Sequence, residues 1–282
     1  MEGPTEECRQ LMIQAHDYAS GGDDYNAIKL CKRAIRLLPT WLPPYECLCG
    51  IYKRRREWKA VLHYNKKIVA IDPARPENWW DVGLSAAATG RFRLARSVWS
   101  KFGQTDVKSF QRKPVIVELV HSGMYELVLA RPLDPVRVVL ESIPHPKSDR
   151  TFRDVLLIGH QQVGTTVVGS RRLSIYPELD LLKRSHFQTW SCILEQVDQS
   201  DIHLMEELCR DAIVGMEIWS NANRAKVIEG KFEYYASNGS HDAGEGEVVL
   251  ALAARRERQV RDVLASWKVI ALKNWRNLER HV

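Results

Sequence analysis

The sequence predicts a multidomain protein of combined α and α+β class, with three consecutive parts. Residues 8–110 are expected to form an N-terminal helical solenoid, because large and small side chains recur there every 34 residues. Residues 113–184 are expected to form a small antiparallel β module, because short β-rich runs alternate with prolines and glycines. Residues 186–282 are expected to form a ferredoxin-like βαββαβ domain, because strand-like and helix-like segments follow in that order.

The period of the first part rests on two prolines and on aligned sets of small and large residues. Pro39 and Pro73 lie one period apart, and each would end a helical unit because proline cannot continue a helix. The aligned small positions are Ala15, Cys49 and Gly83, and the aligned large positions are Leu11, Tyr45 and Trp79. Small residues let paired helices approach closely, so we expect three helix–turn–helix units that bury their faces on one another.

At these positions the sequence resembles the tetratricopeptide repeat (TPR) family, over about residues 8–107. The third copy fits the family pattern best, at Trp79, Gly83, Gly90, Phe92 and Ala95. The second copy departs from it, because Val61 and Ile68 stand where the family prefers alanine. The resemblance implies a concave groove, lined by the first helix of each copy, that holds a peptide or protein segment.

The resemblance also implies which residues face this groove. They are Arg9, Met12, His16, Glu46, Gly50, Lys53, Glu77, Trp80 and Leu84. The residues expected to bind the partner are Met12, His16, Glu46, Lys53, Trp80 and Leu84. Family members that dock a terminal carboxylate use a clamp of Lys, Asn and Arg, which Met12, His16 and Gly50 cannot supply. Trp80 is the expected anchor because aromatic residues dominate interface energetics, although packing against the next element would explain its position equally well.

Positive charge gathers in residues 1–112, which carry 19 Lys and Arg against 12 Asp and Glu. Its densest run is KRRR, Lys53 to Arg56, at the end of a predicted helix, where cations interact favourably with the helix dipole. A solvated charge cluster is the simpler interpretation of this run. We therefore expect no nucleic-acid partner.

The expected strands and helices of the two later parts are identified from short runs of sequence. In the third part, FQTWSCILEQV, VGMEIWS, EVVLALAA and KVIALKNW are expected strands, and DIHLMEELCRDA and RRERQVRDVLASW are expected helices. Residues 220–246 are expected to be a mobile insertion, because SNGSHDAGEGE is polar and rich in glycine. FEYYAS, just before that run, fits either an edge strand or a segment that orders on contact with a partner. The inner strand EVVLALAA has no aromatic residue on which an RNA base could stack.

No motif identifies a reaction. The six cysteines form no CxxC pair and the nine histidines show no HxH or HxxxH spacing, so no metal site is expected. GHQQVGTTVVG lacks the terminal Lys and Ser or Thr of a phosphate-binding loop. His186 and Cys192 would lie about 20 Å apart on one strand, too far to share a proton. We therefore expect no catalytic residue, no cofactor and no enzyme.

The predicted function is that of a non-enzymatic adaptor, which binds a peptide or protein segment in the repeat groove. Three alternatives stay open: a toxin-neutralising or immunity-type binding protein, an enzyme with an unrecognised site in the C-terminal half, and a nucleic-acid binder that uses the basic N-terminal third. A cytoplasmic location without membrane contact is expected. The sequence has no run of about 20 apolar residues, and its first residues lack the basic and then apolar pattern of a signal peptide.

Overall fold

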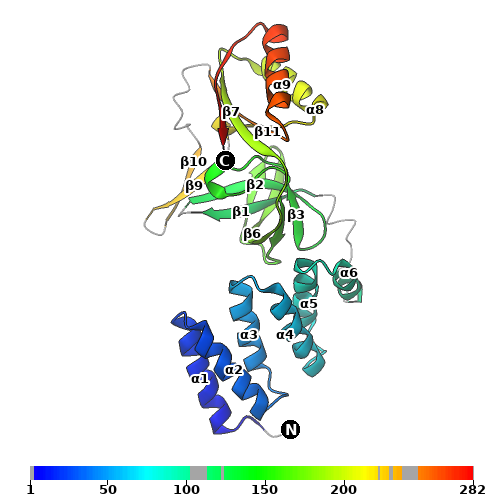
Figure 1. Cartoon of the computed structure of the whole chain (residues 1–282), viewed down its shortest axis with the longest axis vertical. Helices are drawn as coiled ribbons and strands as arrows, with labels where there is room; N and C mark the ends of the chain where they lie inside the picture. The colour runs from blue at the N-terminus through cyan, green and yellow to red at the C-terminus, as the bar shows by residue number, and fades with distance from the viewer. Residues whose placement is uncertain are drawn as a thin grey trace. The chain divides into compact units, whose positions relative to one another are not determined.

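The structure is a computed structural model, and it describes residues 3–101, 113–121, 124–221, 223–228, 231–236 and 247–281. Contacts divide the chain into two compact units, Met1–Lys108 and Ser109–Val282. The described part of the first unit is helical, and the described part of the second unit holds two β-sheets and two longer helices (Figure 1).

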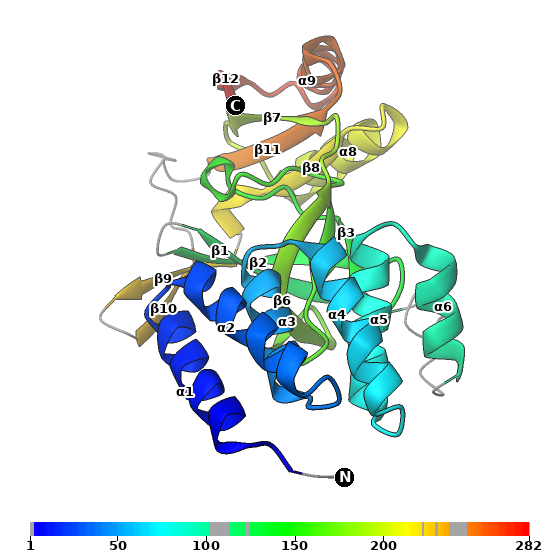
Figure 2. The same ribbon diagram turned by 60° about the horizontal axis from the view of Figure 1, so that its bottom comes forward.

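Six helices in three hairpins make up the described part of the first unit (Figure 2). They are α1 (Glu6–Ser20), α2 (Asp24–Leu37), α3 (Pro43–Arg54), α4 (Trp58–Ile71), α5 (Pro76–Ala88) and α6 (Phe92–Lys101). The second helices of the hairpins, α2, α4 and α6, begin at residues 24, 58 and 92, which is every 34 residues. The three predicted helical hairpins and their period are therefore confirmed.

The turn inside each hairpin has the same backbone conformation. Gly22, Arg56 and Gly90 lie 34 residues apart and have φ angles of 82°, 56° and 75°. Glycine adopts this left-handed conformation readily, whereas a residue with a Cβ atom is strained in it. Arg56 is thus the strained member of the set. The KRRR run lies at a helix end, as predicted, because α3 ends at Arg54.

The junctions between hairpins are fixed by the aligned large residues. Tyr45 donates its hydroxyl hydrogen to the Pro39 carbonyl oxygen at 2.8 Å. One period later, the Trp79 indole Nε1 donates to the Pro73 carbonyl oxygen at 2.9 Å. In the second and third hairpins, the large side chain near the start of the first helix therefore satisfies the carbonyl of the proline that precedes it.

Close approach of two helices explains the smallest residue of the third copy. A Cβ atom built on Gly83 in α5 would lie 2.2 Å from Nε1 of Trp99 in α6. Trp99 is 2% exposed, so its indole fills the space that the missing side chain leaves. The predicted pairing of small and large residues is confirmed at this contact.

Five strands of the second unit close into a barrel. They are β1 (Val115–His121), β2 (Met124–Pro132), β3 (Arg137–Leu140), β4 (Val155–Ile158) and β6 (Arg171–Lys183). Neighbouring strands pair in the order β1-β2-β3-β4-β6, and β6 returns to β1. Buried aliphatic side chains fill the interior, among them Val117, Val128, Leu140 and Leu156. The module is not purely antiparallel as expected, because the closing β1–β6 pair is parallel.

Three further strands extend this sheet. Strand β5 (Gly164–Val168) pairs with β6, and β9 (Asn223–Ile228) pairs with both β2 and β10 (Lys231–Ala236). Residues 223–228 and 231–236, which the sequence placed in an insertion expected to be mobile, are strands of this sheet. They form a hairpin whose outer strand, β10, ends the sheet order. Most of FEYYAS is thus an edge strand, while residues 237–246 lie outside the described part of the chain.

A second sheet has four strands in the order β12-β7-β11-β8, and every neighbouring pair is antiparallel. Its elements in chain order are β7 (Gln188–Leu194), α8 (Gln199–Asp211), β8 (Gly215–Ile218), β11 (Val248–Ala254), α9 (Glu257–Ala271) and β12 (Trp275–His281). The predicted succession of strands and helices is present here. The closed barrel that precedes it is not a ferredoxin-like fold.

The end of this succession differs from the prediction. KVIALKNW was expected to be a strand, but α9 continues to Ala271 and β12 begins at Trp275. Buried Val260, Leu264 and Trp267 place one face of α9 in the core, and Trp267 Nε1 donates to the Asp201 carbonyl oxygen at 2.8 Å. This packing outweighs the strand preference of the β-branched residues that follow.

The barrel and the four-stranded sheet share a core within the second unit. Ile143, Phe152 and Trp219 pack against the face of β11 that carries Ala251 and Ala253. Trp219 Nε1 donates to the Ile143 carbonyl oxygen at 2.9 Å, so a loop of the barrel is tied to the sheet by a buried hydrogen bond.

Candidate functional site

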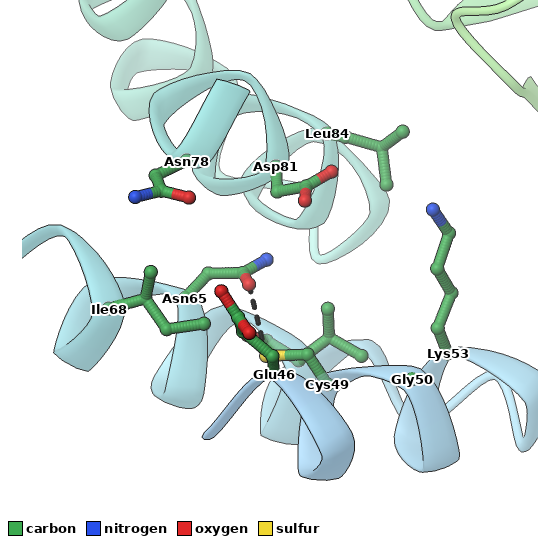
Figure 3. Close-up of a pocket in the computed structure, with 10 residues that line it drawn as sticks. Glu46, Cys49, Gly50, Lys53, Asn65, Ile68, Asn78, Asp81 and Leu84 are labelled. Atoms are coloured by element: carbon green, nitrogen blue, oxygen red, sulfur yellow. Dashed lines mark hydrogen bonds between the residues drawn. The ribbon is translucent and has the colours of Figure 1, made fainter. Parts of the chain in front are cut away.

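A cavity of about 280 Å³ lies between the second and third helical hairpins (Figure 3). Its walls come from α3 and α5, the first helices of these two hairpins, and its floor from α4. The lining residues are Glu46, Cys49, Gly50, Lys53, Val61, Asn65, Ile68, Asn78, Asp81 and Leu84. The first helices of successive repeats are the elements that the sequence predicted to line a groove.

Helical spacing brings these side chains to the cavity. On α3, Glu46, Gly50 and Lys53 follow one another at intervals of four and three residues, which places them on one face. On α5, Asn78 and Asp81 are three residues apart and share a face in the same way. Gly50 has open space around it, since a Cβ atom built there meets no atom within 4 Å.

Hydrogen bonds hold the polar floor in place. Asn65 is 4% exposed, and its Oδ1 accepts from the Cys49 thiol at 3.0 Å. Its Nδ2 donates to Ser85 Oγ at 3.4 Å, and that hydroxyl donates in turn to the Asp81 carbonyl oxygen at 2.6 Å. The buried amide therefore links all three helices that form the cavity.

The charges at the cavity are two carboxylates, on Glu46 and Asp81, and one ammonium group, on Lys53. These charges affect the pKa of the Cys49 thiol. Burial, and then the carboxylates of Asp81 and Glu46, raise the pKa of this thiol to about 12, against the opposing influence of Lys53. Cys49 therefore stays protonated near neutral pH and is a poor nucleophile.

The structure brings three of the six predicted partner-binding residues together. Glu46, Lys53 and Leu84 line the cavity. Met12 is 5% exposed and belongs to the core side of α1, while His16 lies exposed on the same helix. Neither of these two residues lines the cavity.

Trp80 does not line the cavity either. Its ring centroid lies 6.1 Å from that of Trp99, so it packs toward α6. Packing against the next element is one of the two interpretations that the sequence left open for Trp80.

Sequence reasoning missed Asn65, Asn78 and Asp81. A signal existed for Asn65, because it lies between Val61 and Ile68 on the apolar face of a helix. A polar residue in such a position indicates a buried hydrogen-bonding role.

Two residues of the KRRR run are bound to acidic neighbours. Arg54 pairs with Asp24 at 2.8 Å, and Arg55 pairs with Glu57 at 2.7 Å. These ion pairs occupy the side chains within the helical unit. They favour the interpretation of the run as a surface charge cluster.

Elsewhere in the described residues, Cys192 is 1% exposed, and burial raises the pKa of its thiol to about 12. Over the described ranges, no three His, Cys, Asp or Glu side chains gather as a metal ion would need. Within the same ranges, no helix combines the length and the apolar character required to cross a bilayer.

No family model matches the sequence, and no curated protein matches it. Solved structures that it resembles include MamA, with 18% identity, a TM-score of 0.31, and coverage of 37% of this chain and 63% of that one. Another is the Yersinia enterocolitica type III secretion translocator chaperone SycD, with 13% identity, a TM-score of 0.31, and coverage of 37% and 81%.

A third is a mutant O-GlcNAc transferase of Thermobaculum terrenum, with 15% identity and a TM-score of 0.30. The likeness covers 39% of this chain and 22% of the transferase. This chain thus spans less than two thirds of MamA and less than a quarter of the transferase.

Proposed function

We propose that the protein is a non-enzymatic adaptor for protein–protein interaction, and that residues 8–110 are an array of three tetratricopeptide repeats. In this proposal, the cavity between the second and third hairpins holds part of an extended protein segment. We further propose that the four-stranded sheet and its two helices are a ferredoxin-like domain, on the basis of the strand order β12-β7-β11-β8.

The cavity itself carries the proposal. It opens between α3 and α5, which are equivalent helices of consecutive repeats. Its volume of about 280 Å³ lies just under the range of roughly 300–1,000 Å³ that is typical of small-molecule sites. This volume is large enough to accept an amino-acid side chain of a bound segment.

Selection from a displayed library of random 12-residue peptides, with the full chain as bait, tests the proposal. The dissociation constants of enriched peptides are then measured by fluorescence polarisation on two variants of Gly50. Gly50→Trp should block the cavity and weaken binding by at least about tenfold, which corresponds to about 1.4 kcal/mol. Gly50→Ala is the matched control, because it leaves most of the cavity open.

Gly50→Ala should preserve the fold, because a Cβ atom at position 50 meets no atom within 4 Å, and circular dichroism compares the helical content of Gly50→Trp with it. Replacing a helical glycine by alanine also favours the helix. Enriched peptides that bind the Gly50→Trp variant as tightly as the Gly50→Ala variant would show that the cavity is not the binding site. Failure to enrich any peptide would count against the adaptor function itself.

A further inference from the structure

We infer that Cys31 of α2 and Cys47 of α3 are an oxidation site, at which a hydroperoxide joins the two side chains in a disulfide that ties the first helical hairpin to the second. Neither residue lines the cavity between α3 and α5, and the inference goes beyond the adaptor function without depending on it. It follows from the register of the two helices, the contact of the two thiols and the difference in their exposure.

The register of α2 against α3 sets the two cysteines opposite each other. The chain joins the end of α2 to the start of α3, and an ion pair of 2.8 Å joins Asp24, at the start of α2, to Arg54, at the end of α3 (Figure 2). The two helices therefore run antiparallel. Cys31 follows Asp24 by seven residues, and Cys47 precedes Arg54 by seven residues. Seven residues make about two turns, so each cysteine lies on the same face of its helix as the charged residue.

The two thiols are in contact, as this register requires. The Cys31 thiol donates a hydrogen bond to the sulfur of Cys47. Ala27 and Ala34 flank Cys31 on its face of α2, and both are fully buried. Such small residues let the next helix approach closely, which a disulfide needs because the Cα atoms that it joins lie about 4.4–6.8 Å apart.

The two cysteines differ in exposure and in acidity. Cys47 is half-buried and Cys31 is fully buried, so an oxidant from solution reaches Cys47 first. The hydrogen bond from Cys31, and then the Arg54 guanidinium, lower the pKa of the Cys47 thiol, against the effects of burial and Asp24. The hydrogen bond to Cys47 and burial raise the pKa of Cys31. Because the thiolate is the reactive form, Cys47 is the attacking residue and Cys31 the one that completes the disulfide.

The reaction has two steps. In the first, the Cys47 thiolate attacks an oxygen of hydrogen peroxide, the S–O bond forms, the O–O bond breaks, and the leaving hydroxide takes up a proton to become water. In the second, the Cys31 sulfur attacks the sulfenic acid on Cys47, the S–S bond forms, and hydroxide leaves with the proton of Cys31 as a second water. The two thiols lose two electrons and two protons, and the peroxide is reduced to two molecules of water.

The disulfide would strengthen the junction between the first two hairpins. Cys31 and Cys47 are 16 residues apart, and closing a loop of about 15 residues changes an unfolding equilibrium constant on the order of a hundredfold. Oxidation should therefore slow hydrogen exchange of amides in α2 and α3 by up to this factor. The effect on α6, in the third hairpin, should be smaller, because each repeat contacts mainly its neighbours.

Peptide mass spectrometry of the full chain tests the inference. The reduced protein is treated with hydrogen peroxide, free thiols are blocked with iodoacetamide, and tryptic peptides are mapped without reduction. The main disulfide should join the peptide of Cys31 to the peptide that holds both Cys47 and Cys49. Cys49→Ser is the matched control and assigns the bond, since it should leave the link intact. Its hydroxyl can replace the thiol as the donor to Asn65.

Two further variants separate the roles of the two cysteines. In Cys31→Ala, Cys47 should still be oxidised but should stay a sulfenic acid, which dimedone traps. In Cys47→Ser, Cys31 should remain reduced at the same dose of peroxide, because it is fully buried. Circular dichroism shows whether each variant keeps the helical content of the wild type.

Three results would overturn the inference, and none of them bears on the adaptor function. The first is a Cys47 that stays reduced, or that is oxidised without forming the link to Cys31. The second is a link that is lost in Cys49→Ser, which would assign the disulfide to Cys49. The third is a link that forms only after the chain has been unfolded in urea, because the folded contact of the two thiols would then have no part in it.

Discussion

Replacing Gly83 by alanine should destabilise the third hairpin. The same replacement at Gly50, in α3, should instead stabilise the second hairpin. A Cβ atom at position 83 would lie 2.2 Å from Nε1, 2.7 Å from Cε2 and 2.9 Å from Cδ1 of Trp99. Trp99 is 2% exposed and packs near Trp80, so its ring cannot move aside easily. Overpacking of a core costs about 1–3 kcal/mol, and we expect a cost at the upper end of this range because the contact is so close.

The intrinsic preference for the helix acts in the opposite direction. Alanine is favoured over glycine in a helix interior by about 1 kcal/mol, so the expected net loss for Gly83→Ala is about 2 kcal/mol. Gly50→Ala gains the same preference without a clash, since nothing lies within 4 Å of the added atom. The two variants should therefore differ by about 3 kcal/mol in free energy of unfolding.

Urea unfolding followed by circular dichroism measures this difference. Hydrogen exchange of amides in α5 and α6 reports on the third hairpin separately, which matters because the chain holds two compact units. Adding Trp99→Phe, which removes the indole Nε1, should cost less in the Gly83→Ala variant than in the wild type. Equal stabilisation by the two glycine-to-alanine substitutions would refute the close approach of α5 and α6.

Three other substitutions or modifications test separate parts of the account. Arg56→Gly should stabilise the second hairpin by about 1 kcal/mol, because glycine adopts the positive φ of 56° without strain. Thermal unfolding measures this gain. Arg55→Gly is the control and should not stabilise the hairpin, because Arg55 has a φ of −82°. The hydrogen bond from the Ser200 hydroxyl lowers the pKa of Asp198, the N-cap of α8, so its contribution to stability is present above the unfolded pKa of about 3.9 and is lost as pH falls through the lower folded pKa. Urea midpoints of the wild type and Asp198→Ala should thus differ near neutral pH and converge in strong acid, and a gap that persists in acid would contradict this origin. Iodoacetamide should label Cys47 before Cys49, because the hydrogen bond with Cys31 lowers the pKa of Cys47, whereas burial raises the pKa of Cys49 to about 12. Peptide mass spectrometry gives the order of labelling. The reverse order would be inconsistent with these pKa directions.

The sequence predicted the helical hairpins well because their determinants are local and repeated. Pro39 and Pro73, and Tyr45 and Trp79, have the same roles one period apart, as their hydrogen bonds show. The candidate site was predicted only in part. The positions of Glu46, Lys53 and Leu84 in the lining could be predicted from the phase of the repeat. The role of the buried Asn65 could not, because it depends on hydrogen bonds with Cys49 and Ser85, which belong to two other helices.

The features of the later parts that the sequence did not predict depend on long-range packing. Residues 223–228 pair with β2, about a hundred residues earlier in the chain, and no local pattern encodes that partner. The last turn of α9 is apolar and rich in β-branched residues, which favours a strand when read alone. The burial of Trp267 among residues of the four-stranded sheet and its helices keeps the segment helical.

Nuclear magnetic resonance tests whether a protein segment binds between the second and third hairpins. An enriched peptide is titrated into the full, isotope-labelled chain, and shifts of amide signals are followed. The largest shifts should occur in α3 and α5 around Gly50 and Asp81, and at the side-chain amide of Asn78. Saturable binding with its largest shifts in residues 113–281, and none around the cavity, would contradict the account.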